Sequence, residues 1–264
     1  MKCSDARVLL TGASGGNGRA VADALLAAGA NLLLAGRDGA RLQQLLGTLA
    51  ERHPGAAERL IWQRADLGHN DDLRRLADAA AAWNCNVLVH GAGVPAFGRL
   101  QTLAPAQLRA ALDTNLLAPM LLTQALMPHL QTLPRAQVIC IGSALGRIGL
   151  PGFSVYSASK FGLRGFAEAL RRELADSGVG VQYLGPRSTR TEFNSPGVEE
   201  YNRATGTTMD RPERVAQALL RQLEDEQPER FIGFPETLAV RLNGLAAPWL
   251  DGAFAKHRRS LPIT

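Results

Sequence analysis

Short apolar runs alternate with longer segments of helical periodicity along the chain. The runs have the length of β-strands and cover residues 7–11, 31–35, 60–64, 86–90, 137–141, 179–184 and 230–233. Strands that alternate with helices pair in parallel through right-handed crossovers, which place helices on both faces of one sheet. The pattern therefore predicts an α/β fold with a doubly wound, seven-stranded parallel sheet. Ligands of such sheets bind beyond the carboxyl ends of the strands.

All residues from 1 to 264 are expected to form one domain, because a single α/β core of this size is ordinary. The stretch from Pro186 to Met209 has no regular pattern, and residues 187–209 are predicted to form a lid that contacts the substrate. Asp210 and Glu213 have the spacing of a capping box, which predicts that a helix begins there and ends near Gln227.

A helical tail is predicted at about residues 236–260. Leu238, Leu242, Leu245 and Trp249 recur at helical spacing within it. The resulting apolar stripe can pack on the body of the protein, on a partner subunit or on a membrane surface. The sequence leaves these three alternatives open.

The composition is that of a globular protein, with 46% hydrophobic and 20% charged residues. The net charge is +5, but the basic residues are scattered, and without a continuous basic face no nucleic-acid partner is expected. Three cysteines without zinc-like spacing indicate neither a disulfide framework nor a metal site. No stretch reaches the roughly 20 apolar residues of a membrane span. The first strand follows Met1 too closely for a signal peptide, so a cytoplasmic location is expected.

A glycine-rich turn follows the first predicted strand. Residues 11–18 read Thr-Gly-Ala-Ser-Gly-Gly-Asn-Gly, and the alanine- and leucine-rich segment after them favours a helix. Glycines allow the backbone to approach a pyrophosphate, and the start of a helix supplies free N–H groups and positive dipole charge. The order of strand, turn and helix predicts a dinucleotide site, although this glycine spacing alone also fits an ordinary loop.

A tyrosine and a lysine at helical spacing form the candidate proton-transfer pair. Tyr156 and Lys160 lie in a segment with helical periodicity, so both side chains project from one face. The phenol of tyrosine has an unperturbed pKa of about 10, and a neighbouring ammonium lowers that pKa by stabilising the phenolate. Tyr156 would then protonate a substrate oxygen during reduction or accept its proton during oxidation. In isolation, such a pair is more typical of packing or surface residues than of a catalytic site.

Several motifs stand in the order and approximate spacing of the short-chain dehydrogenase/reductase family: the glycine turn, His90-Gly-Ala-Gly93, Asn115, Ser143 and Tyr156-x-x-x-Lys160. The chain resembles this family from about residue 7 to residue 191. The resemblance implies a Rossmann-like fold with the strand order 3-2-1-4-5-6-7. It also implies an NAD(P)-dependent oxidoreductase that acts on CH–OH and C=O groups.

The same resemblance assigns roles in the reaction. Tyr156 is the general acid or base, Ser143 hydrogen-bonds the reacting oxygen, and Lys160 also holds the nicotinamide ribose. Asn115 positions a water that links Lys160 to solvent. The cofactor supplies the hydride, and no metal is needed. The residues expected to bind the cofactor are Gly12, Ser14, Gly15, Gly16, Asn17, Gly18, Arg37, Asp66, Leu67, Gly91, Ala92, Gly93, Tyr156, Lys160, Pro186, Thr189 and Thr191.

The sequence departs from the family pattern at three places. Asn17 replaces the usual isoleucine of the glycine turn, His90-Gly91 replaces the more frequent Asn-Asn, and Arg187 replaces a glycine. Pyrophosphate binding should survive the first change, because the backbone N–H remains. A structural role is expected for His90. The change at Arg187 affects the conformation of the loop that carries Thr191.

The residues after the second and third strands bear on the choice of nucleotide. Arg37 lies where a carboxylate often binds the ribose of NAD and an arginine pairs with the 2′-phosphate of NADP. Gly36 stands where NAD-selective relatives often carry Asp. NADP(H) is therefore the expected cofactor and NAD(H) the second choice, with a solvated Arg37 as the alternative. Asp66, which the family uses to bind the adenine amino group, also fits a helix N-cap.

Together these features predict an NADPH-dependent enzyme that reduces a small-molecule ketone or aldehyde, 3-oxoacyl compounds included, to an alcohol, or runs the reverse reaction. The alternative is a catalytically weak NADP(H)-binding sensor or interaction protein on the same fold. The family's habit also predicts a homodimer or homotetramer, paired through two long helices at about residues 104–130 and 156–177. Phe161 and Phe166 fit either the monomer core or this contact.

Overall fold

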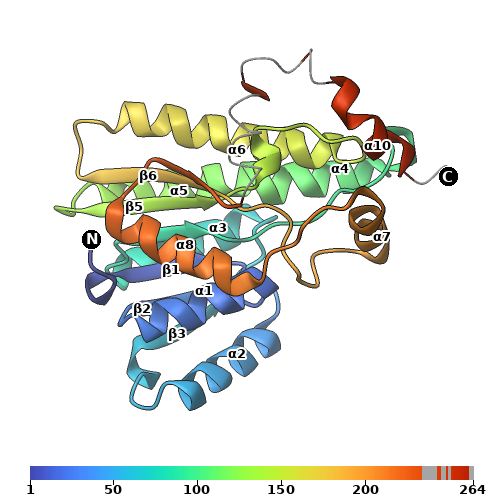
Figure 1. Cartoon of the computed structure of the whole chain (residues 1–264). Helices are drawn as coiled ribbons and strands as arrows, with labels where there is room; N and C mark the ends of the chain where they lie inside the picture. Colours follow the sequence, from blue (N-terminus) through green and yellow to red (C-terminus); the bar gives the residue numbers. More distant parts are fainter. Residues whose placement is uncertain (234–242, 245–247, 249–250, 262–264) are drawn as a thin grey trace.

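A twisted sheet of parallel strands runs through the computed structural model (Figure 1). The structure describes residues 1–233, 243–244, 248 and 251–261. The strands are β1 (Arg7–Thr11), β2 (Asn31–Gly36), β3 (Leu60–Arg64), β4 (Val87–His90), β5 (Ala136–Ile141), β6 (Val179–Gly185) and β7 (Glu229–Phe231). Their order is β3-β2-β1-β4-β5-β6-β7, which confirms the predicted fold class and strand order.

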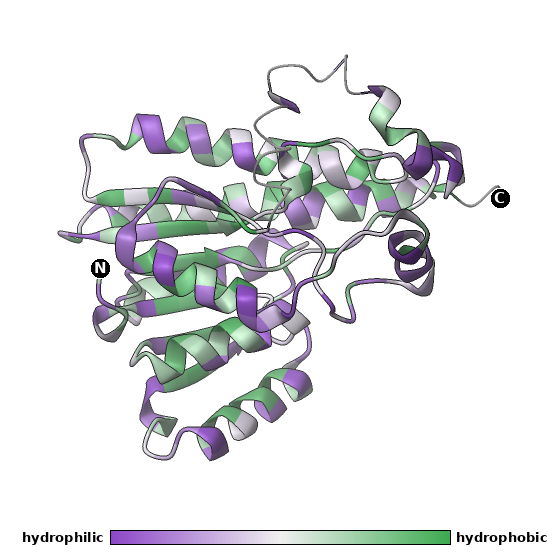
Figure 2. Ribbon diagram, viewed as in Figure 1, coloured by the Kyte–Doolittle hydropathy of each residue, from purple (hydrophilic) through white to green (hydrophobic). Residues whose placement is uncertain are grey.

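Helices cover both faces of the sheet. One face carries α1 (Gly16–Ala27), α2 (Gly39–Arg52) and α8 (Pro212–Asp225). The other carries α3 (Asn70–Ala82), α5 (Ala118–Leu130) and α6 (Ser154–Glu173). Strands β4 and β5 are buried along their whole length, as expected for a parallel sheet covered on both sides. Figure 2 shows these central strands as mostly hydrophobic, whereas hydrophilic residues lie on the helices. The two apolar layers hold the carboxyl ends of the strands in fixed positions.

The helix predicted at about residues 104–130 is interrupted. α4 (Pro105–Leu112) leads into a π-helical turn, η4 (Asp113–Leu117), which α5 follows. Pro119 has no N–H to donate to the carbonyl of Asn115 four residues earlier, so regular α-helical bonding cannot continue through the turn. The prediction of one uninterrupted helix was wrong at this point.

The predicted lid contains a helix in a stretch where the sequence analysis saw no regular pattern. α7 (Pro196–Thr205) begins after Ser195, whose hydroxyl accepts a hydrogen bond from the N–H of Val198 at 3.4 Å. It ends at Gly206, which has a φ of 76°. Serine and proline at the start and glycine at the end are ordinary signals of helix boundaries. The sequence therefore contained the signals of this helix.

The predicted capping box of α8 was also wrong. The N-cap is Arg211, and the carboxylate of Asp210 accepts hydrogen bonds from Arg187 at 2.9 and 2.8 Å and from Arg214 at 2.8 Å. Two guanidinium groups are stronger partners for this buried carboxylate than the free N–H groups of a helix end. Asp210 therefore pairs with the loop after β6.

Two short helical segments of the predicted tail fall within the described residues. They are η6 (Asp251–Phe254) and α10 (Ala255–Arg259), and α10 lies beside α7 (Figure 1). Leu238, Leu242, Leu245 and Trp249 lie outside the described residues. Among the helices that the structure describes, none is both long and apolar enough to cross a membrane.

Candidate active site

The strands open at their carboxyl ends into a cavity of about 960 Å³. Strand β1 pairs with β2 on one side and with β4 on the other, so the strand order reverses at this place. Open α/β sheets bind their ligands at such a reversal. Every residue predicted to bind the cofactor or to act in catalysis lines the cavity, except Asn115. The structure therefore brings motifs from distant parts of the chain into one site.

The glycine turn packs tightly against the loops that follow β4 and β6. A Cβ atom on Gly12, which has a φ of +67°, would lie 2.6 Å from the backbone of Ala92. A Cβ on Gly16 would lie 2.5 Å from a methyl carbon of Thr191. Gly15, by contrast, has only the carbonyl of Gly12 nearby, at 3.4 Å. Glycine is thus required for the assembly of the turn, and the start of α1 faces the cavity.

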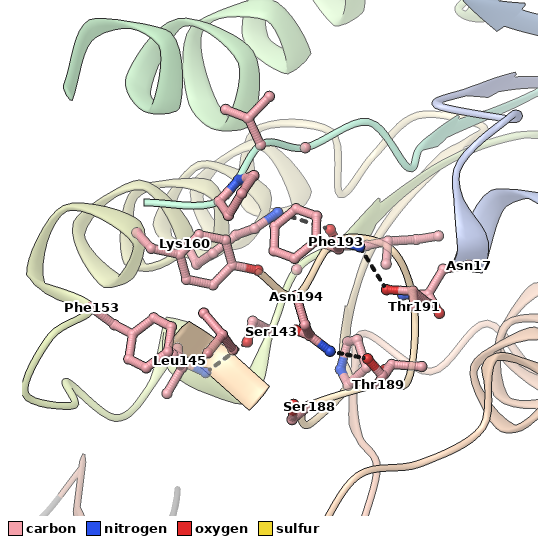
Figure 3. A pocket seen from close by; sticks show the side chains of 18 of the residues that line it. Asn17, Ser143, Leu145, Phe153, Lys160, Ser188, Thr189, Thr191, Phe193 and Asn194 are labelled. Atoms are coloured by element: carbon pink, nitrogen blue, oxygen red, sulfur yellow. Dashed lines mark hydrogen bonds between the residues drawn. The ribbon is translucent and has the colours of Figure 1, made fainter. Parts of the chain in front are cut away.

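The start of α1 suits a bound dinucleotide. Figure 3 shows Asn17, in the first turn of α1, beside Thr191, and both residues line the cavity. The first N–H groups of a helix have no partner within the helix, and the helix dipole adds positive charge at the same end. Together with the glycine turn, this end of α1 suits the pyrophosphate of a nicotinamide dinucleotide.

Two arginines line the cavity beyond the end of β2. Arg37 was predicted, whereas Arg41, in the first turn of α2, was missed. Asp38 accepts a hydrogen bond from the N–H of Arg41 at 3.1 Å and caps α2, so its carboxylate is engaged there. Asp66 accepts from the N–H of Gly68 at 3.0 Å and does not cap α3, so the N-cap alternative for Asp66 was wrong.

Ser143 is held in place by a tyrosine that the sequence analysis missed. The hydroxyl of Tyr183 accepts from the N–H of Ser143 at 2.9 Å and donates to its carbonyl at 2.8 Å. The Ser143 hydroxyl accepts from the N–H of Leu145 at 3.0 Å, which leaves its own proton free to donate to a ligand. A tyrosine inside a buried strand needs a polar partner, and that is the sequence signal for Tyr183.

Tyr156 and Lys160 lie on one side of α6, facing the cavity. The ammonium of Lys160 is 5.7 Å from the centre of the Tyr156 ring and donates to the carbonyl of Ile141 at 3.3 Å. Burial lowers the pKa of Lys160 to about 8. Burial also raises the pKa of Tyr156 to about 12, although the hydroxyl of Ser143 opposes this rise. Desolvation therefore outweighs the lowering expected from Lys160, and Tyr156 retains its proton.

Asn115 lies behind the cavity and joins two of its walls. Its Oδ1 accepts from the N–H of Val94 at 2.8 Å, and its Nδ2 donates to the Val94 carbonyl at 3.0 Å and to the Ser159 hydroxyl at 3.2 Å. The side chain thus fixes the loop after β4 to α6. Its role in positioning a water stays a prediction.

His90 is buried at the end of β4. Its Nε2 lies 2.8 Å from the hydroxyl of Thr123, and burial, together with the charge of Lys160, lowers the pKa of His90 to about 3. The imidazole is therefore neutral at physiological pH, in agreement with the structural role expected for it.

An ion pair joins the loop after β6 to Asp210, which lies just before α8. Arg187, which replaces the family's glycine, forms the ion pair with buried Asp210. Backbone hydrogen bonds reinforce it, from Asp210 to Ser188 at 2.8 Å and from Arg190 to Asp210 at 2.9 Å. In Figure 3 the side chain of Asn194 reaches the Thr189 carbonyl, a distance of 2.8 Å. The Arg187 to Asp210 pairing was missed because no local pattern links residues so far apart.

Two phenylalanine rings lie beside Tyr156, and one of them, Phe193, also lies next to Gly93, where a Cβ atom would be 3.8 Å from its ring. The ring centre of Tyr156 lies 5.9 Å from that of Phe193 and 6.4 Å from that of Phe153. Phe153 in turn lies 5.5 Å from Tyr201 of α7. Phe193 and Tyr201 fall within the predicted lid at residues 187–209, whereas the sequence analysis missed Phe153.

The chain is similar to known proteins over most of its length. The family model described as short chain dehydrogenase matches residues 6–202. Dehydrogenase/reductase SDR family member 7B of Xenopus laevis is 31% identical, over 90% of this chain and 77% of that protein. The uncharacterized oxidoreductase YxnA of Bacillus subtilis is 29% identical, over 94% of this chain and 71% of that protein.

Solved structures with bound nucleotides resemble the chain as well. A metagenomic short-chain oxidoreductase in complex with NADP has a TM-score of 0.72 and 29% identity, over 87% of this chain and 98% of that one. A short chain dehydrogenase/reductase from Burkholderia phymatum in complex with NAD has a TM-score of 0.83, over 94% of this chain and 96% of that one. At 22% identity, the second likeness shows the fold alone.

Proposed function

Since this chain belongs to the short-chain dehydrogenase/reductase family and is an NAD(P)-dependent oxidoreductase, we propose that it reduces carbonyl compounds with NADPH, or oxidises the corresponding alcohols. One observation carries the proposal. Ser143, Tyr156 and Lys160 line the same cavity as the glycine turn, although they come from a strand end and a helix far along the chain. A proton donor therefore lies in the same cavity as the glycine turn that is expected to bind the nucleotide.

The chain's own residues supply the proton and the orientation of the substrate. Bound NADPH would supply the hydride for the carbonyl carbon. The hydroxyl of Ser143 accepts a hydrogen bond from the N–H of Leu145 and donates its own proton in a hydrogen bond to the carbonyl oxygen. Tyr156 passes its phenolic proton to that oxygen as the alcohol forms, and the ammonium of Lys160 stabilises the phenolate left behind. In the oxidative direction, the same groups return the proton.

The preference for NADPH rests on charge. Arg37 and Arg41 line the cavity beyond β2, and the nearest carboxylate on this segment, that of Asp38, is engaged at the start of α2. A guanidinium group is the usual partner of the 2′-phosphate, whereas NAD-selective folds present a carboxylate to the ribose. The NADP complex of the metagenomic relative supports the same choice.

The alternative function is a nucleotide sensor without turnover. Such a protein would have no need of Ser143, Tyr156 and Lys160 in one cavity, and all three are present. NADPH consumption by the purified protein, measured with a panel of ketones and aldehydes, separates the two functions. The proposal expects carbonyl-dependent loss of NADPH with an alcohol as the product. NADPH binding without any turnover across the panel would favour the sensor.

A further inference from the structure

The end of the described chain forms one wall of the cavity. We call residues 251–261 the tail segment. Ala253, Phe254 and His257 of this segment line the cavity. Lys256 donates to the Thr205 carbonyl of α7 at 3.1 Å, and Nδ1 of His257 lies 2.7 Å from the hydroxyl of Tyr201. The tail segment thus contributes directly to the site.

A row of rings leads from the catalytic phenol to the tail segment. Beyond Tyr156 and Phe153, the ring of Tyr201 lies 5.5 Å from Phe153 and 5.6 Å from His257, and His257 lies 5.9 Å from Phe254. All five rings line the cavity. A substrate whose oxygen reaches Tyr156 would therefore extend along this row.

The Tyr201 hydroxyl and Nδ1 of His257 both have hydrogen-bond partners. The Tyr201 hydroxyl donates to the carbonyl of Pro151 at 3.2 Å and accepts from Nδ1 of His257 when that nitrogen carries the imidazole proton. Burial lowers the pKa of His257, and the nearby charge of Lys256 acts in the same direction, so the imidazole is neutral near pH 7. The wall therefore offers the partly exposed rings of Phe254 and His257, whereas Tyr201, which is only 2% exposed, holds His257 in place.

The remaining described lining on this side is uncharged, and it includes the polar side chain of Asn202. Among the described residues that line the cavity from segments 94–96, 144–153, 198–202 and 253–257, no side chain is that of Asp, Glu, Lys or Arg. The arginines of the cavity lie elsewhere: Arg37 and Arg41 follow β2, and Arg187 is paired with Asp210. A carboxylate or phosphate on the substrate would lose its hydration here. Lys256 of the tail segment does not line the cavity, and its ammonium donates to the Thr205 carbonyl.

We propose that α7 and the tail segment form a recognition wall for neutral ketones whose bulk is an apolar ring, with Phe254 and His257 as specificity-determining residues and Tyr201 as the residue that positions His257. The inference rests on the proposed carbonyl reduction. A ring on the substrate packs against the row edge-on or offset, as aromatic pairs prefer. An anionic or strongly polar substrate of the same size is excluded by the desolvation of its charge.

Three matched ketones test the wall: butan-2-one, 4-phenylbutan-2-one, and the para-carboxylate of the phenyl compound. They share one methyl ketone, so the chemistry at Tyr156 is constant. With NADPH, kcat/KM should be highest for the phenyl ketone, by about tenfold or more, because burial of a phenyl group is favourable and burial of a carboxylate is not.

Substitutions in the tail segment and α7 test which side chains cause the preference for the phenyl ketone. His257→Ala should lower kcat/KM for the phenyl ketone by about three- to tenfold, which is the range of an aromatic contact, and should leave butan-2-one unchanged. Phe254→Ala should act in the same direction. Tyr201→Phe keeps the ring and should keep the preference. Arg258→Ala, on the exposed side of α10, is the matched control and should behave as the wild type.

A binding measurement separates this inference from the proposed reaction. Calorimetric titration of the three ketones into the NADPH complex of Tyr156→Phe reports recognition without turnover. Preferential binding of the phenyl ketone with no turnover by the wild type would contradict the reaction and leave the wall standing. Four results would overturn the wall. Two concern the wild type: equal kcat/KM for butan-2-one and the phenyl ketone, or a preference for the carboxylate. The others are an equal loss with all ketones in His257→Ala and no binding of any ketone.

Discussion

At the scale of single residues, the proposed preference for NADPH depends on Arg37. Arg37→Ala removes one guanidinium group beyond β2 and should weaken NADPH binding by about ten- to a hundredfold, since a charge-assisted hydrogen bond contributes roughly 1.5–3 kcal/mol. NADH has no 2′-phosphate, so its affinity should not change. Nucleotide fluorescence titration measures both constants. Arg109→Ala removes an exposed charge outside the cavity and serves as the control. An equal loss of both nucleotides in Arg37→Ala would refute phosphate recognition.

The charge of Lys160 sets a second residue-scale prediction. The pKa of this lysine is lowered by burial to about 8, so the ammonium is present below that pH and is lost as the pH rises through it. The pKa of Tyr156, raised to about 12, keeps the phenol protonated over the same range. The kcat/KM for NADPH-dependent reduction should therefore fall above about pH 8.

The variant Lys160→Arg is the control for this fall in kcat/KM, the alkaline limb of the pH profile. A guanidinium does not titrate in this range, so the variant, at whatever activity it retains, should have no limb near pH 8. An unchanged limb in Lys160→Arg would assign it to another group.

At the scale of secondary-structure elements, the strands followed from the sequence almost residue by residue, because buried parallel strands are continuous apolar runs. The catalytic and glycine motifs could also be placed, since each follows a strand or lies on one helix. The hydrogen bonds of the Asn115 side chain and the Asp210 pairing were not predictable in the same way. Both depend on partners that only the folded chain brings near, Val94 in the first case and Arg187 in the second.

The ion pair at the base of the lid gives an element-scale prediction. Asp210→Asn keeps the shape of the side chain but removes the negative charge that pairs with the largely buried Arg187. The loss of one partner of a buried pair costs about 3–5 kcal/mol in unfolding free energy. Urea unfolding measures this change, and limited proteolysis should show faster cleavage between β6 and α8. Wild-type stability and cleavage in Asp210→Asn would show that the pair does not hold the lid. Asp113→Asn, outside this network, is the control.

At the scale of the whole molecule, we predict self-association through the faces of α4, η4 and α6. Phe166 packs against the core, whereas Phe161 remains 39% exposed, and Leu112 and Leu117 on the adjoining elements are also exposed. Sedimentation at micromolar concentration should therefore show at least two chains of 28.2 kDa.

A pair of substitutions tests this face. Phe161→Glu should shift the protein toward the monomer, since it places a charge in the apolar contact. Trp62→Glu alters an aromatic of similar exposure, 38%, on the edge strand β3 and should leave the assembly intact. A monomeric wild type with full activity would rule out the assembly.

We propose above all that Tyr156 delivers the proton in a site that binds NADPH. Tyr156→Phe removes only the phenolic oxygen and its proton, and the ring contacts with Phe153 and Phe193 can remain. The direct test measures NADPH affinity and single-turnover reduction of the best carbonyl substrate in this variant and in the wild type. We predict unchanged NADPH affinity in Tyr156→Phe and a rate lower by at least about a hundredfold, the lower range of general acid catalysis. A wild-type rate in Tyr156→Phe with NADPH bound would contradict it.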